Sequence, residues 1–189
     1  MQPGDSDADR VRTTTLEAFA DTIIPGAKRS PQDRAIAGVA TGAGAVVAGA
    51  VELLEMPAAG VAAGLDYLAQ AANGHAQAYA AEQGLTLDDD VPAFVALPYE
   101  HRAAVIQRLT ARDNPERDGW VLLALFSNMA FDLAPHRNTA EAIADGHPGL
   151  SAMGFAPPND DGLWRFPDYS YGRPLANLHP DTIPSGSLG

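Results

Sequence analysis

The chain has 189 residues, which suits one domain with extensions and is short for two full domains. Its net charge of −12 argues against nucleic acid or an anionic membrane as a partner, because both require clustered Lys and Arg. The sequence contains no cysteine, which excludes disulfides, thiolate metal sites and cysteine nucleophiles.

The N-terminal segment, residues 1–12, is polar and acidic, and we expect it to be disordered. It has no twin arginine and no basic stretch followed by an apolar one, so it does not resemble an export signal. We therefore expect the chain to be cytoplasmic as encoded, with export alongside a partner left open.

An amphipathic helix is predicted next, ending at Pro25 and Gly26. Glu17 stands three residues after Thr14, which is the spacing of a capping box. Asp21 lies off the apolar face in the last turn, where a carboxylate meets the negative end of the helix dipole. Two interpretations of Asp21 stay open. It is an ordinary exposed residue, or it binds an Arg or the backbone N–H groups of another segment.

A weaker helical pattern, rich in Ala and Gly, covers residues 34–56. Gly38, Gly42 and Gly49 recur at spacings of four and seven residues, which predicts a small-residue face for a close helix–helix contact. The alternative is a flexible linker, because each interior glycine costs a helix about 1 kcal/mol relative to alanine. Residues 35–51 carry no charge, but they offer too few large apolar side chains for a membrane span.

Helical patterns continue over residues 57–83, 94–109, 119–131 and 140–145. Residues 119–131 are uncharged and apolar on every side, which predicts a helix in the middle of a bundle. Residues 85–91 form an acidic loop without the ligand spacing of a calcium site, so we interpret the loop as solvated. The chain is thus predicted to be all-α, with a helical domain over residues 13–150 built as a bundle of about five to six helices.

Residues 151–189 are predicted to form an extended, irregular C-terminal arm. The arm is rich in Pro and aromatic residues and has neither helical nor strand periodicity. Such an aromatic composition is not typical of disorder, so we expect the arm to pack on the chain's own helices or on a partner. The predicted partner-binding residues are Trp164, Phe166, Tyr169, Tyr171 and Arg173.

Residues with the potential for chemistry form no strong motif. The histidines lack metal-binding spacing, and no nucleophile elbow or phosphate-binding loop occurs. The weak catalytic candidates are Asp132 and His136, which are four residues apart and form either a carboxylate–histidine pair or a structural contact. A pocket near these two residues, Trp120 and Phe126 is the alternative hypothesis, for a stand-alone small-molecule-binding protein or enzyme. We expect no metal and no cofactor on this chain.

Parts of the sequence resemble a known family. Leu16–Gly26 resembles the opening motif of the gluconate 2-dehydrogenase subunit 3 family, and Phe94–Pro98 with Arg102 and Leu109 is similar to that family's second segment. The closing region, from Gly119 to Arg173, resembles an actinobacterial branch of small proteins that occur alongside flavin-dependent oxidoreductases of the glucose–methanol–choline type.

The resemblance implies a non-catalytic small subunit. In that family the small chain binds a large FAD-bearing dehydrogenase, so FAD is expected on the partner, an alcohol or sugar dehydrogenase or oxidase. Asp21, Pro25 and Gly26 would then be structural motif residues. Many members carry a twin-arginine signal, which is not found here. Stabilising or gating the large subunit is therefore the better expectation than escorting it through export.

Overall fold

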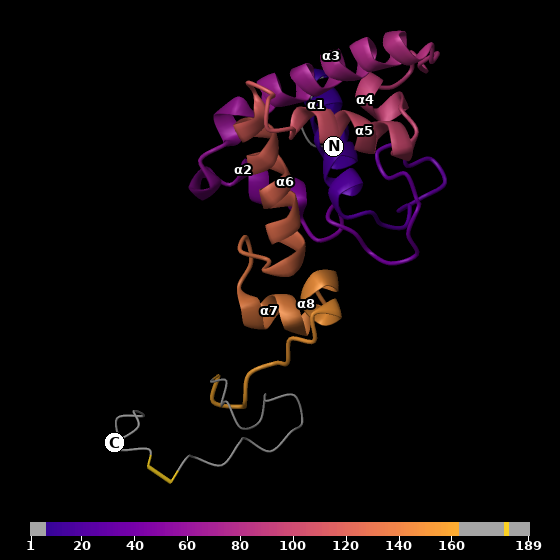
Figure 1. Ribbon diagram of the computed structural model, residues 1–189. Coiled ribbons are helices and arrows are strands. Elements are labelled where there is room, and N and C mark those ends of the chain that lie inside the picture. Colours follow the sequence, from indigo (N-terminus) through magenta and orange to yellow (C-terminus); the bar gives the residue numbers. More distant parts are fainter. Residues whose placement is uncertain (1–6, 163–179, 182–189) are drawn as a thin grey trace. The chain divides into compact units, whose positions relative to one another are not determined.

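The computed structural model describes residues 7–162 and 180–181 (Figure 1). All regular structure in these residues is helical, which confirms the predicted fold class. The chain divides into two compact units, Met1–Phe155 and Ala156–Gly189. None of the described helices combines the length and the apolar character that crossing a bilayer requires.

The described part of the first unit contains four long and four short α-helices. The long ones are α1 (Asp7–Ile23), α3 (Leu65–Gln83), α5 (Tyr99–Leu109) and α6 (Arg117–Asp132). The short ones are α2 (Ala50–Glu55), α4 (Ala93–Ala96), α7 (Thr139–Ala144) and α8 (Pro148–Ala152), and two 3-10 turns, Pro57–Ala59 and Ala62–Gly64, precede α3. The predicted segment 94–109 is two helices, because the chain is extended at Leu97 and Pro98.

Helix α1 is the centre of the first unit, since it packs against α2, α3, α4, α5 and α6. Phe19 of α1 lies between two other buried rings, with ring centroids 6.1 Å from Phe94 of α4 and 6.1 Å from Trp120 of α6. Aromatic pairs at such distances add about 0.5–1.5 kcal/mol to the effect of burial alone. The three rings therefore join α1, α4 and α6 at the core.

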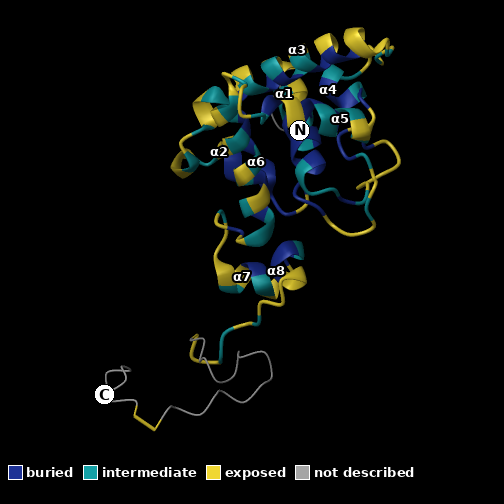
Figure 2. Cartoon of the chain, in the orientation of Figure 1, coloured by how far each residue is buried: buried dark blue, intermediate teal, exposed yellow. Residues whose placement is uncertain are grey.

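Helix α6 packs against α1, α2, α5 and α8 but keeps one exposed strip, so it is central to the bundle without being enclosed on every side as predicted (Figure 2). Its inner side buries Trp120, Leu123, Ser127 and Ala130. On the outer side, Leu122 is 39% exposed and Leu125 is 50% exposed. The sequence pattern records which residues are apolar, but it does not tell whether enough neighbouring elements exist to cover them.

The largest departure from the predicted fold lies between α1 and α2. No helix forms over 34–49, and residues 24–49 follow an irregular path before α2 begins. Gly38 and Gly49 have φ angles of +76° and +91°, which right-handed helices do not contain. The predicted helical face of glycines is therefore absent, because the glycines supply turns instead.

Two other glycines allow main-chain segments to touch. A Cβ added at Gly44 would lie 2.4 Å from the carbonyl oxygen of Ile24, so only glycine fits where these two parts of the irregular segment touch. A Cβ added at Gly149, in α8, would lie 1.8 Å from the carbonyl oxygen of Phe131 in α6. Gly149 thus lets α8 pack directly on the end of α6.

Replacing Gly149 with alanine is expected to destabilise the first unit. The added methyl group overlaps a main-chain oxygen, and overpacking of this kind costs about 1–3 kcal/mol or more. Gly74→Ala is the matched control, because Gly74 lies in α3 with open space around it and should gain about 0.5–1 kcal/mol in helix propensity. Urea unfolding followed by circular dichroism compares the two variants. Equal stability of Gly149→Ala and the parent chain would contradict the close contact.

The N-terminal boundary also differs from the prediction. Helix α1 begins at Asp7, so residues 7–12, which the sequence predicts to be disordered, are helical. Arg12 is held there by an ion pair of 2.8 Å with Glu55 of α2. The capping box predicted for Thr14 and Glu17 does not exist, because both residues lie inside the helix.

Several predicted helix ends are confirmed. Helix α3 ends at Gly84, which has a φ angle of +65°. The side chain of Asn138 caps α7 by accepting hydrogen bonds from two backbone N–H groups, and Gly146 follows that helix with a φ angle of +71°. The predicted C-terminal arm begins later than residue 151, because residues 151 and 152 belong to α8.

The predicted partner-binding residues of the arm, Trp164, Phe166, Tyr169, Tyr171 and Arg173, lie outside the described residues.

Candidate functional site

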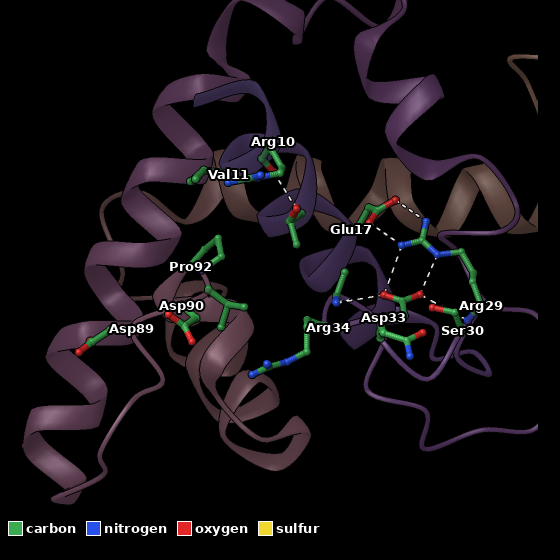
Figure 3. A pocket seen from close by; sticks show the side chains of 14 residues that line it. Arg10, Val11, Glu17, Arg29, Ser30, Asp33, Arg34, Asp89, Asp90 and Pro92 are labelled. Atoms are coloured by element: carbon green, nitrogen blue, oxygen red, sulfur yellow. Dashed lines mark hydrogen bonds and ion pairs between the residues drawn. The ribbon is translucent and has the colours of Figure 1, made fainter. Parts of the chain in front are cut away.

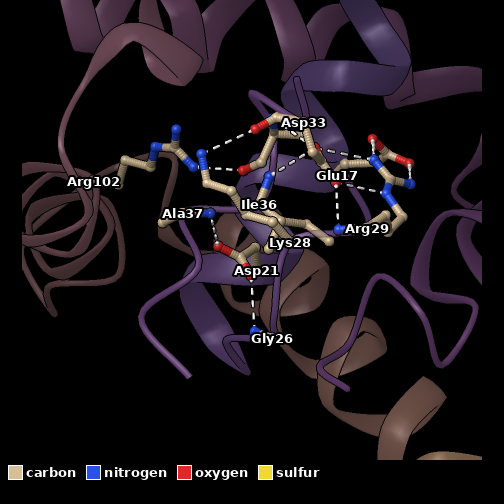
Figure 4. Close-up of polar contacts among 10 residues, drawn as sticks. Glu17, Asp21, Gly26, Lys28, Arg29, Asp33, Ile36, Ala37 and Arg102 are labelled. Atoms are coloured by element: carbon tan, nitrogen blue, oxygen red, sulfur yellow. Dashed lines mark hydrogen bonds and ion pairs between the residues drawn. The ribbon is translucent and has the colours of Figure 1, made fainter. Parts of the chain in front are cut away.

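Asp21 is buried at the end of α1, with 1% of its surface exposed. Its Oδ1 accepts a hydrogen bond of 3.0 Å from the N–H of Gly26, and its Oδ2 accepts one of 2.8 Å from the N–H of Ala37 (Figure 4). Of the two interpretations left open for Asp21, the structure supports binding to backbone N–H groups. Burial raises the pKa of Asp21, and the two backbone hydrogen bonds act in the opposite direction.

Arg102 of α5 holds the same irregular segment from another side and is 4% exposed. It donates 2.6 Å hydrogen bonds to the carbonyl oxygens of Ala35 and Val95 and a 2.9 Å bond to that of Leu97, with a longer bond to Arg34. Burial lowers the pKa of Arg102, while the charge of Asp21 acts to raise it. One guanidinium thereby joins the irregular segment to α4 and α5.

A third polar group fixes the start of the irregular segment. Arg29 donates hydrogen bonds of 2.5 and 2.7 Å to the two carboxylate oxygens of Glu17, and its Nε donates one of 2.7 Å to Asp33. Asp33 also accepts hydrogen bonds from the N–H groups of Ala35 and Ile36. Burial alone would raise the pKa of Asp33, but the hydrogen bonds from Arg29 and from the N–H of Ile36, together with the charge of Arg29, keep that pKa below its usual range.

These three groups position one wall of a surface hollow of about 720 Å³ (Figure 3). The hollow lies between the N-terminal half of α1, residues 29–35 and residues 89–92. Its charged lining residues are Arg10, Glu17, Arg29, Asp33, Arg34, Asp89 and Asp90. Arg34 is paired at 2.6 Å with Asp88 and Arg10 at 3.1 Å with Asp7, so together with Arg29 all three arginines that line the hollow already have a carboxylate partner. The hollow offers ionic and hydrogen-bonding contacts on a wall that the protein itself holds in place.

The weak catalytic candidates Asp132 and His136 are given different partners by the structure. Asp132 accepts a 2.6 Å hydrogen bond from the side chain of Asn128. The ring of His136 lies against Gly49, and its centroid is 6.4 Å from that of the His147 ring. The printed contacts of Asp132 and of His136 therefore involve different neighbours.

The pocket predicted around Trp120, Phe126, Asp132 and His136 is not formed as one site. Asp132 follows Trp120 by twelve residues in α6, a separation of about 18 Å at 1.5 Å per residue. Trp120 is buried against Phe19. Phe126 packs on both of the larger apolar clusters of the core. Helix length alone separates the two ends of the proposed pocket.

His147 and His136 lie together at the corner formed by α2, α6 and α8. His147 is 3% exposed, its Nδ1 accepts from the N–H of Leu150, and its Nε2 lies 3.0 Å from the carbonyl oxygen of Ala48. Because a carbonyl cannot donate, the proton of His147 is on Nε2. Burial lowers the pKa of the nearby His136.

Acidification is expected to destabilise this corner through His136. Because its pKa is lower in the folded chain, the unfolded chain binds more protons between the folded pKa and the ordinary value of about 6.5. The contribution of neutral His136 to the free energy of unfolding is therefore complete above the unfolded pKa. It is lost as the pH falls from that value through the folded pKa. Urea unfolding at pH 7.5 and 5.5 measures the loss. His136→Gln should show a smaller difference between the two pH values, and an unchanged difference would contradict the assignment.

Residues 10–189 match the family of unknown function DUF5987. The chain belongs to this family. No curated protein and no solved structure matches the chain. The match covers α1 from its second turn onward, the irregular segment, and α5. The DUF5987 region therefore includes every residue of the three polar groups. Within the described part of the DUF5987 chain, no cluster of three or more Asp, Glu or His side chains is suited to hold a metal ion.

Sequence reasoning assigned no role to Arg102, although a signal for it exists. Arg102, Val105, Ile106 and Leu109 are spaced as i, i+3, i+4 and i+7, so the arginine occupies the first position of the buried stripe of α5. An arginine on an apolar face requires acceptors, because an unpaired buried charge is costly. The spacing of these residues does not predict which acceptors Arg102 binds.

Proposed function

We propose that this DUF5987 chain is a non-catalytic small subunit that binds and stabilises an FAD-dependent alcohol or sugar dehydrogenase or oxidase of the glucose–methanol–choline type. The flavin belongs to the large subunit in this proposal. One observation supports it above the others. The two segments that resemble the gluconate 2-dehydrogenase subunit 3 family act on the same loop, with Asp21 and Gly26 from the first and Arg102 from the second.

The charged residues Asp21 and Arg102 of the two segments hold the backbone of a loop in the folded chain. Asp21 accepts from backbone N–H groups and Arg102 donates to backbone carbonyl oxygens, and these contacts fix the path of residues 26–37. A motif of this kind maintains the shape of a surface. Maintenance of a surface is what a binding subunit requires, because rigid partners lose less conformational entropy on association.

Co-expression with the glucose–methanol–choline-type flavoprotein of the same genome tests the proposal. We expect the two chains to co-purify and the flavoprotein to gain soluble yield and flavin content. Gating of the substrate entrance would appear as a changed KM at constant flavin content, and escort as export of the flavoprotein that depends on this chain. Equal yield, equal flavin content and no complex would contradict the proposal.

A second candidate function is supported by the hollow beside Arg29 and Arg34. Its volume of about 720 Å³ lies within the range of about 300–1,000 Å³ that is typical of ligand sites. If the chain is a small-molecule-binding protein, this hollow is therefore a better candidate for its binding site than the region around Trp120. Thermal unfolding of the isolated chain with small charged metabolites tests it. A rise in Tm that Arg34→Gln abolishes would favour this candidate over the first.

A further inference from the structure

The side of α6 that faces away from the core carries a strip of apolar residues, which we call the outer face of α6. It consists of Asp118, Val121, Leu122, Leu125, Met129 and Asp132. Steps of three and four residues place these side chains on one side of a helix. Leu125 is 50% exposed and Leu122 is 39% exposed, whereas the opposite side of the helix is buried.

The apolar residues of the strip follow one another from Val121 to Met129, and the exposed polar side chain of Asn128 borders them beside Asp132. Val121 and Met129 are partly buried beside the two exposed leucines, and Leu133, immediately after the helix, is 53% exposed. Single exposed apolar residues are ordinary on protein surfaces, but several in one row mark a surface that another molecule covers. The uniformly apolar sequence of α6 is explained if a partner covers this row.

The charges around the strip indicate what kind of partner covers it. Asp118 stands at one end with 99% of its side chain exposed, and Asp132 stands at the other end. The only basic neighbour in this helix is Arg117, which pairs with Asp118 at 3.3 Å, and an exposed pair of this kind contributes little. The whole chain carries a net charge of −12. Two copies would therefore bring like charges together, whereas a basic rim on a different protein would complement them.

We infer that the outer face of α6 is the surface through which this chain binds the large flavoprotein subunit, and that the complementary patch on that subunit is apolar with a rim of Lys and Arg. This inference rests on the proposed function. The leucines enter the centre of the interface, where well-packed apolar side chains contribute most of the affinity. The two aspartates at the ends of the strip contribute mainly to the association rate and its dependence on salt.

Titration of the full chain against the flavoprotein, followed by calorimetry or surface plasmon resonance, tests the inference with matched variants. Leu125→Asp should weaken binding by about tenfold or more, because it places a charge at the centre of the interface. Val39→Asp is the control, since Val39 is exposed to 55% but lies in the segment between α1 and α2. Asp118→Lys should slow association and reduce its sensitivity to salt. Circular dichroism of each variant verifies that the helices are intact.

The outcomes separate the inference from the function on which it rests. Absence of binding by the parent chain would overturn both. Binding by the parent chain and equally tight binding by Leu125→Asp would overturn the assignment of the surface and leave the proposed function in place. Light scattering that shows a dimer of the parent chain and a monomer of Leu125→Asp would overturn the inference in favour of a second copy as the occupant.

Discussion

Replacing Asp21 with alanine is expected to lower the free energy of unfolding by about 3–5 kcal/mol. The substitution leaves the N–H groups of Gly26 and Ala37 without an acceptor, and each unsatisfied buried group costs about 1–3 kcal/mol. It also removes the carboxylate whose charge acts on Arg102. Urea unfolding followed by circular dichroism measures the change.

Two further variants make the Asp21 result interpretable. Asp21→Asn keeps one acceptor but turns its amide N–H toward the remaining backbone donor, so we expect a smaller loss than for alanine. Asp89→Ala removes an exposed carboxylate and should change stability by less than about 0.5 kcal/mol. A loss no larger for Asp21→Ala than for Asp89→Ala would contradict the role of Asp21 as a buried acceptor.

The carboxylate of Asp21 stabilises through its hydrogen bonds and costs stability through its buried charge. Because burial raises its pKa, the folded chain binds the proton more tightly than the unfolded chain between the ordinary pKa and the folded one. Protonation of Asp21 therefore adds to the free energy of unfolding. The addition is complete below the ordinary pKa of the carboxyl group and is lost as the pH rises through its pKa in the folded chain. Asp21→Asn should remove this component from the pH dependence of unfolding.

Replacing Arg102 with methionine is expected to cost a similar amount, about 3–5 kcal/mol. Methionine matches the length of the stem but cannot donate, so the carbonyl oxygens of Ala35, Val95 and Leu97 lose their hydrogen bonds. Arg102→Lys keeps the charge yet has one nitrogen in place of a planar fork, so it should restore only part of the loss.

Arg108→Met is the control for Arg102, because Arg108 lies in the same helix with 53% of its side chain exposed. Its ion pair with Glu82 is at the surface and should contribute less than about 1 kcal/mol. The double variant Asp21→Ala with Arg102→Met should lose less than the sum of the two single losses, because both side chains hold the same segment. Strict additivity would mean that the two sites stabilise independent parts of the chain.

Local features of the fold were predictable from neighbouring residues. Gly84 and Gly146 end helices because glycine accepts the left-handed conformation at low cost, and Asn138 begins one because its side chain reaches the first free N–H groups. Such signals act within a few residues along the chain. The ends of several helices therefore follow from sequence alone.

The irregular path of residues 24–49 was not predictable in the same way. Its Ala- and Gly-rich composition is compatible with a weak helix, a linker or a loop, and the energy differences among them are small. Contacts with distant residues decide between these states. Gly44 packs on the backbone at Ile24, while Asp21 and Arg102 bind the segment from α1 and α5.

The helical character of the chain, the ends of most of its helices and the unfavourable position of Asp21 in the helix dipole can all be derived from the order of the residues. The partners of Asp21 and Arg102, and the exposed outer face of α6, become visible only in the folded chain. The difference lies in the range of the interactions. Helix propensity and capping are local, whereas the acceptors of a buried charge and the neighbours of an apolar face come from segments that meet only after folding.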